Sequence, residues 1–254
     1  MLSYQRFGAA QGERPILLAH GLFGSGRNWG AIAKRLAQAR PVTTVDMRNH
    51  GSSFRAPTQS YEEMAADLAD VIRDHDGPMD VLGHSMGGKA AMALALTEPE
   101  RVARLIVGDI APVSYSHSHS GYIAAMRALD LSSVTRRSEA DRALRESIDD
   151  AAQRAFLLQS LQVTDGRAVW LLNLDALDAA MPQILDFPTF STSFDRPALF
   201  VSGSESAYVT AEHRPAIRAL FPAARFVAIK GAGHWLHADN PNAFVEVVAG
   251  FLGR

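Results

Sequence analysis

The chain has no cysteine among its 254 residues, which excludes disulfides, zinc–thiolate sites, iron–sulfur clusters and a cysteine nucleophile. Nucleophilic catalysis would therefore have to use Ser, Thr, Asp or Lys. The chain also lacks an apolar run near the roughly 18 residues of a membrane span, and its first residues lack the pattern of a signal peptide. We therefore expect a cytoplasmic protein with no membrane span.

Neither sign of charge dominates, because 25 Lys and Arg residues stand against 27 Asp and Glu residues, a formal net charge of -2. This balance gives no bulk attraction to nucleic acid or to anionic membranes, so a small-molecule substrate is the expected partner. Hydrophobic residues make up 47% and charged residues 20%, values typical of a packed globular protein. The length suits one large domain. The oligomeric state is not indicated.

Short apolar runs alternate with helical segments along the chain, a pattern that predicts an α/β fold with a mostly parallel sheet flanked by helices. In such sheets the ligand site lies outside the carboxyl ends of the strands. Polar or glycine-rich turns follow each run, so these turns are expected to meet at one edge. The clearest runs are residues 15–19, 41–45, 79–82, 104–107, 197–201 and 225–229.

The regular spacing of strands stops after Pro112 and resumes near Arg196. Between them, apolar residues recur at helical spacing, which predicts an inserted helical cap over residues 113–191 and a core formed by 1–112 and 192–254. Caps exclude water and shape the substrate pocket. The apolar residues are Ala151, Ala155, Leu158 and Leu161, followed by Trp170, Leu171, Leu174 and Leu177.

The segment Gly83-His84-Ser85-Met86-Gly87 lies between an apolar strand and the predicted helix over 89–96. This strand, turn and helix context is that of the nucleophile elbow of α/β hydrolases, in which flanking glycines allow the sharp turn. The pattern predicts Ser85 as a nucleophile. An elbow with serine argues against a dehalogenase or epoxide hydrolase, which would need aspartate there.

A serine hydroxyl needs a base to take its proton, and His234 is the best candidate. It follows the last predicted strand, precedes a closing helix from about residue 242, and satisfies the chain order Ser, acid, His. His237 is the alternative. His117 and His119 are interpreted as a solvated hinge of the cap rather than a metal site, because further ligands are not found nearby.

The oxyanion formed during acyl transfer needs preorganised N–H donors. The expected pair is the Met86 amide and the Leu22 amide, with Phe23 as the alternative to Leu22. His20 is expected to orient this loop. A second loop, with Asp46 and Arg48, is interpreted as a brace built on charge-assisted hydrogen bonds.

The acid is less obvious than the nucleophile and the base. Many α/β hydrolases carry it in a Gly-x-x-Asp stretch after the strand matching 197–201, but here that position holds Ser206. Two carboxylates could replace it: Glu205, one residue earlier, or Asp109, at the end of the strand after the nucleophile strand. We favour Asp109, because its strand should lie between the other two and chain order is kept. Glu205 stays the alternative acid.

Taken together, these motifs resemble one branch of the α/β hydrolases, the YbfF-type esterases, whose mitochondrial relatives are abhydrolase-domain proteins. The resemblance implies esterase activity on small acyl esters, extending to acyl thioesters such as acyl-CoA, with the acid at Asp109 and Ser206 near the histidine. The matching segments are His20–Ser25, Asp46–Gly51, Gly83–Lys89, Val107–Pro112, Arg154–Leu158 and Gly233–Trp235.

The sequence therefore predicts a serine esterase that works through a Ser-His-Asp triad and an acyl-enzyme. No metal or organic cofactor is implied. Another serine-triad activity, such as that of a carbon–carbon bond hydrolase, a lyase or a perhydrolase, is the main alternative. A non-catalytic ligand-binding protein with the same fold is the other.

Overall fold

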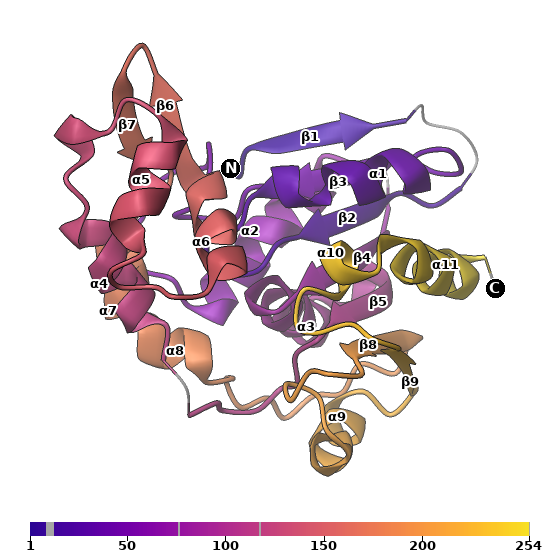
Figure 1. The fold of residues 1–254 in the computed structure, drawn as a ribbon. Coiled ribbons are helices and arrows are strands. Elements are labelled where there is room, and N and C mark those ends of the chain that lie inside the picture. Colours follow the sequence, from indigo (N-terminus) through magenta and orange to yellow (C-terminus); the bar gives the residue numbers. More distant parts are fainter. Residues whose placement is uncertain (9–12, 76, 117, 254) are drawn as a thin grey trace.

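The computed structural model describes residues 1–8, 13–75, 77–116 and 118–253. The central sheet contains β1 (Tyr4–Phe7), β2 (Ile16–Ala19), β3 (Val42–Val45), β4 (Met79–His84), β5 (Val102–Gly108), β8 (Ala198–Gly203) and β9 (Ala224–Ile229). Their order across the sheet is β1-β3-β2-β4-β5-β8-β9 (Figure 1). Only β1 runs antiparallel to its neighbour. The predicted α/β fold with a mostly parallel sheet is confirmed, although β1 was not predicted.

Helices cover both faces of the sheet because successive side chains of each strand point to opposite faces. Leu17 of β2 packs into the hydrophobic cluster on one face of the sheet. Its neighbours Ile16 and Leu18 pack into a second hydrophobic cluster on the opposite face. On the Leu17 face lie α2 (Tyr61–Arg73), α3 (Met86–Thr97) and α9 (Arg214–Leu220). The opposite face is covered by α1 (Gly30–Leu36) and α11 (Pro241–Leu252).

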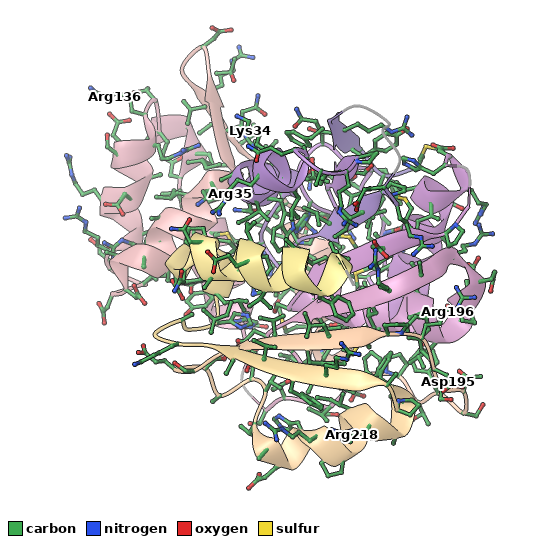
Figure 2. All side chains as sticks on the ribbon, turned by 90° about the vertical axis from the view of Figure 1, so that its right-hand side faces the viewer. Lys34, Arg35, Arg136, Asp195, Arg196 and Arg218 are labelled. Atoms are coloured by element: carbon green, nitrogen blue, oxygen red, sulfur yellow. The ribbon has the colours of Figure 1, made fainter. Side chains whose placement is uncertain are left out.

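Local sequence explains where these helices begin and how they pack. The Ser60 hydroxyl accepts a hydrogen bond from the Glu63 amide, and the Glu63 carboxylate accepts one from the Ser60 amide, a capping box that starts α2. Helix α3 is apolar almost all round and is buried from Met86 to Leu96, as expected of a central helix. Arg35 of α1 donates to Asn242 of α11, whose helix lies alongside (Figure 2).

The segment between β5 and β8 forms a separate layer beside the ends of the central strands (Figure 1). It contains α4 (Ser120–Ala128), α5 (Arg137–Leu144), α6 (Ala151–Leu157), β6 (Leu161–Thr164), β7 (Arg167–Trp170), α7 (Leu174–Ala179) and α8 (Met181–Leu185). The predicted helical spacing is wrong at Leu161, which begins β6, and at Trp170, which ends β7. The Asp165–Gly166 turn, with positive φ at both residues, forms a hairpin there instead.

The remaining elements are short. Helix α10 (Leu236–Asp239) precedes α11, and 3₁₀ turns occupy Gly26–Trp29, Pro99–Arg101, Leu131–Ser133, Leu158–Ser160 and Ala211–His213. Within the described ranges, no helix has both the length and the apolar character needed to cross a bilayer.

Candidate active site

Ser85 occupies a strained turn between β4 and α3, with φ 52° and ψ -121°. The two glycines of the motif are required by close backbone contacts. A Cβ on Gly83 would lie 2.1 Å from the Gly87 carbonyl oxygen, and a Cβ on Gly87 would lie 2.5 Å from that of His20. A non-glycine residue held at positive φ costs energy that the surrounding packing must supply. The turn therefore holds the Ser85 hydroxyl at the carboxyl edge of the sheet.

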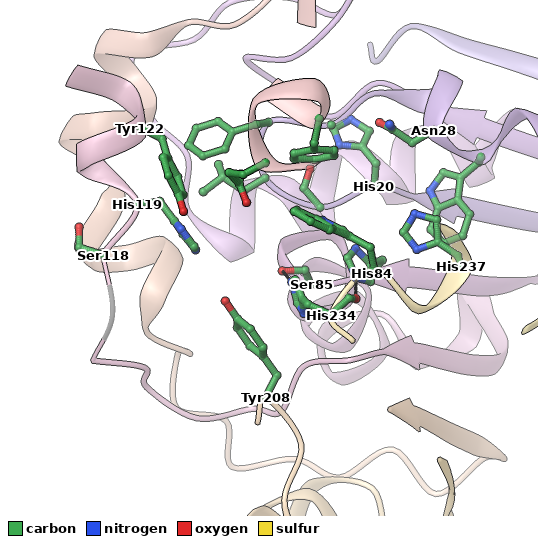
Figure 3. A pocket seen from close by; sticks show the side chains of 18 residues that line it. His20, Asn28, His84, Ser85, Ser118, His119, Tyr122, Tyr208, His234 and His237 are labelled. Carbon is green, nitrogen blue, oxygen red and sulfur yellow. Dashed lines mark hydrogen bonds between the residues drawn. The ribbon is translucent and has the colours of Figure 1, made fainter. Parts of the chain in front are cut away.

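The structure brings the three predicted residues Ser85, His234 and Asp109 into one hydrogen-bonded chain. His234 Nε2 lies 3.1 Å from Ser85 Oγ (Figure 3). His234 Nδ1 lies 2.8 Å from Asp109 Oδ2. Strand β5 lies between β4 and β8, so its end at Asp109 faces the imidazole. With Nδ1–H donating to the carboxylate, Nε2 is free to accept the serine proton.

Asp109 is completely buried and its carboxylate is well satisfied. Oδ2 also accepts a hydrogen bond from the Ser206 hydroxyl, and Oδ1 accepts one from the Gly203 amide at 3.2 Å. Ser206, which stands where the Gly-x-x-Asp pattern has its carboxylate, thus donates to the Asp109 carboxylate. Glu205, the alternative, is exposed and its amide bonds to the Ala232 carbonyl. The geometry favours Asp109.

Two neighbours hold His234 in place. His84, the residue before Ser85, donates from Nε2 to the His234 carbonyl at 2.8 Å. The Tyr208 ring stacks on the imidazole, with centroids 3.9 Å apart and planes 20° apart. Sequence reasoning missed Tyr208, although its place two residues after Ser206 was a usable signal. His237, the alternative base, packs instead on the Trp29 ring at 4.6 Å.

The loop after β2 is organised by two buried histidines. His20 Nε2 accepts the Met47 amide at 2.9 Å while its Nδ1–H donates to the Gly21 carbonyl at 2.8 Å. His50 Nε2 accepts the Phe23 amide at 3.1 Å. Because the Phe23 N–H is already used in this way, Leu22 is the better oxyanion donor of the two alternatives.

Asp46 and Arg48, predicted to brace the loop after β3, each make charge-assisted hydrogen bonds there. Asp46 accepts hydrogen bonds from the Gly26 and Ser52 amides, at 2.7 Å each. Arg48 pairs with Asp67 at 2.6 Å rather than with Asp46, so the two charges fix separate parts of the loop. The reason is that Arg48 faces α2, whereas Asp46 faces the turn that follows β2.

Burial lowers the pKa of His20 from 6.5 to about 4 and that of His50 to about 3, so both are neutral in the folded protein at pH 7. The unfolded chain binds more protons between about pH 4 and the ordinary pKa of 6.5. The free energy of unfolding should therefore fall as the pH drops through this range, by up to about 1.4 kcal/mol per pH unit for each histidine. Chemical denaturation of the His20→Asn variant from pH 7.5 to pH 4.5 should show a shallower decline than the wild type. An unchanged slope of the free energy of unfolding against pH would contradict the prediction. The difference between the two proteins at pH 7.5 measures separately the packing that the variant loses.

A cavity of about 370 Å³ lies above Ser85, between the strand ends and the segment 113–191. Phe156 of α6 packs on Trp235 at 5.2 Å, closing one side. His119, predicted to lie in a solvated hinge, is partly exposed, lines the cavity and stacks on Tyr122 with ring centroids 6.0 Å apart. His117 lies outside the described residues. In the described part of the chain, no group of three or more His, Asp or Glu side chains is placed to hold a metal ion.

Comparison with known proteins places this chain in a family. A family model for the alpha/beta hydrolase fold matches residues 14–241. The chain belongs to the α/β hydrolases. This family includes "Esterase YbfF" of Escherichia coli (strain K12), which is 39% identical over 94% of this chain and 92% of its own length. The predicted resemblance to YbfF-type esterases is thereby confirmed.

Two further relatives agree with this assignment. The "sn-1-specific diacylglycerol lipase ABHD11" of Mus musculus is 42% identical over 93% of this chain and 80% of its own length. A solved structure described as "Marine microorganism esterase" superposes with a TM-score of 0.94 at 37% identity, covering 98% of both chains. Relatives named as esterases and lipases support a hydrolase built on this fold.

Proposed function

We propose that the protein is a serine esterase that hydrolyses small acyl esters through a Ser85–His234–Asp109 triad and an acyl-enzyme. The observation that carries the proposal is the continuous chain of hydrogen bonds from Ser85 Oγ through His234 to the buried Asp109 carboxylate. This is the arrangement that activates a serine for nucleophilic attack. It opens into the cavity described above, which would hold the substrate.

In the proposed reaction, His234 Nε2 takes the Ser85 proton as Ser85 Oγ attacks the ester carbonyl. The Leu22 and Met86 amides stabilise the oxyanion. His234 then gives the proton to the leaving alcohol, and a water activated by the same imidazole releases the acid and regenerates Ser85. Asp109 stabilises the imidazolium and fixes its tautomer, while residues 113–191 act as a cap that excludes bulk water.

The same chemistry extends to acyl thioesters such as acyl-CoA. A thioester carbonyl is attacked in the same way, and its thiolate leaves with less help from His234 because a thiol is more acidic than an alcohol. Discrimination between the two classes would therefore come from the cavity rather than from the triad.

A panel of p-nitrophenyl esters and acyl-CoA thioesters of graded chain length tests the proposal. We expect turnover of short p-nitrophenyl esters, and we expect a fluorophosphonate probe to label Ser85 and abolish that turnover. Labelling without turnover of any ester or thioester would favour a carbon–carbon bond hydrolase, lyase or perhydrolase. Neither labelling nor turnover would favour a non-catalytic ligand-binding protein.

A further inference from the structure

Two cavities meet at Ser85. The large cavity measures about 370 Å³ and the small one about 20 Å³ on the same scale. Both are lined by Leu22, Ser85, His119 and Tyr208, so a substrate attacked by Ser85 can extend into either. Figure 3 shows Tyr208 and His119 on either side of the approach to Ser85.

The position of His234 distinguishes the two cavities. His234 lines the large cavity, whereas the small cavity is lined by Met86 beside Ser85. During acyl transfer the imidazole must protonate the leaving oxygen, so that oxygen has to lie on the His234 side of the carbonyl carbon. The alcohol therefore points into the large cavity, and the acyl chain is left with the small one.

We infer that the small cavity is the acyl site, that it admits acetyl and propionyl groups, and that the large cavity accepts a bulky alcohol. This inference rests on the proposed esterase function and specifies its substrate class. A space of this size holds about one to two water-sized groups, enough for the methyl of an acetyl ester or the ethyl of a propionyl ester. A longer acyl chain would have to displace packed side chains of the core and the cap.

One side of the small cavity is apolar. Ile110 follows β5 and Ile184 belongs to α8 of the cap; they are 4% and 6% exposed. Leu185 completes this side. These side chains suit a hydrocarbon group and set the depth of the cavity.

The polar groups around the small cavity are already bound to protein atoms. Lys89 Nζ donates to the carbonyls of Val113, Leu185 and Asp186, at 2.9, 2.9 and 2.7 Å, which uses all three of its protons. The Tyr61 hydroxyl donates to the Ile184 carbonyl at 2.6 Å. An acyl group ending in a carboxylate would have to compete for these donors, so neutral acyl groups are expected.

The test uses two substrate series. In the first, the alcohol is p-nitrophenol and the acyl group grows from acetate through propionate and butyrate to hexanoate and octanoate. In the second, the acyl group is acetate and the alcohol grows from methanol to benzyl alcohol and naphthol. We expect kcat/KM to drop by about tenfold or more beyond propionate, since one excess methylene costs about that much in a filled pocket. Across the second series it should stay level or rise.

Ile184→Ala tests the wall directly. The substitution keeps the backbone carbonyl that accepts the Tyr61 hydrogen bond, so that contact remains. Because the smaller side chain deepens the cavity, the preferred acyl group should lengthen to butyrate or hexanoate. Phe156→Ala is the matched control, because Phe156 lines the large cavity; it should change the order of the alcohols and leave the acyl preference as it was. Should Ile184→Ala not fold, Ile184→Val removes one carbon and should raise butyrate relative to propionate.

The outcomes separate this inference from the proposed function. Fastest turnover of hexanoate or octanoate by the wild type, or an acyl preference moved by Phe156→Ala but not by Ile184→Ala, would overturn the inference while leaving the esterase intact. Faster turnover of a monosuccinate ester than of a propionate ester would also overturn it. Failure of every ester to react, with no labelling of Ser85, would instead refute the proposed function.

Discussion

The Ser85→Ala variant should lose essentially all ester hydrolysis, with kcat falling on the order of 10⁶-fold, as expected when the nucleophile of a triad is removed. The alanine methyl cannot form the acyl-enzyme, and what remains is the modest effect of the oxyanion donors and of binding. The loss should appear in kcat rather than in KM. It is measured with p-nitrophenyl acetate, and the fluorophosphonate probe should no longer label the protein.

Ser52→Ala is the matched control for this substitution. Ser52 is exposed, and the hydrogen bond it makes to Asp46 comes from its backbone amide, which alanine retains. Its kcat and its labelling should equal those of the wild type. Ester hydrolysis that persists in Ser85→Ala, at a rate near that of this control, would rule out the proposed nucleophile.

The Asp109→Asn variant should lose about 10⁴-fold in kcat, as expected for the acid of a triad. The amide of asparagine can donate to His234 Nδ1, which would place the imidazole proton on Nε2 and leave it unable to accept from Ser85. The amide also lacks the negative charge that stabilises the imidazolium. The matched comparison is Glu205→Gln, which changes an exposed carboxylate and should keep activity within about twofold.

Activity of both variants is compared under the same conditions, and circular dichroism with thermal unfolding establishes that each is folded. This check matters for Asp109→Asn because the carboxylate is buried and accepts hydrogen bonds from Ser206, Gly203 and His234. A large loss in Glu205→Gln, with Asp109→Asn close to the wild type, would reverse the assignment of the acid.

Most of the sheet could be predicted because its strands are short apolar runs that end at turn residues. The missed strand β1 reads Tyr-Gln-Arg-Phe, with polar residues facing solvent at the edge of the sheet, so it carries no apolar run. Within residues 113–191, the apolar residues near Trp170 fit both a helix and a strand. The Asp165–Gly166 pair was the local signal for the hairpin.

The candidate site likewise contains residues that the sequence could predict and residues that it could not. Ser85 could be predicted because glycines at 83 and 87 are needed wherever a strand turns this sharply into a helix. The sequence did not indicate which groups His84 and His119 contact. His84 donates to the carbonyl of His234, which lies on another segment of the chain. The His119 ring stacks on Tyr122, a contact that forms only when the chain folds.

The sequence by itself determined the elbow at Ser85, the late histidine and the alternating pattern of the sheet, because these follow from sterics and periodicity within a few neighbouring residues. Only the tertiary structure decided that Asp109 rather than Glu205 faces His234, that Tyr208 covers the imidazole, and that cavities of unequal size meet at Ser85. Those features depend on contacts between separate segments of the chain, such as Asp109 and His234, which are 125 positions apart. Strand order and packing set these contacts, and local sequence does not.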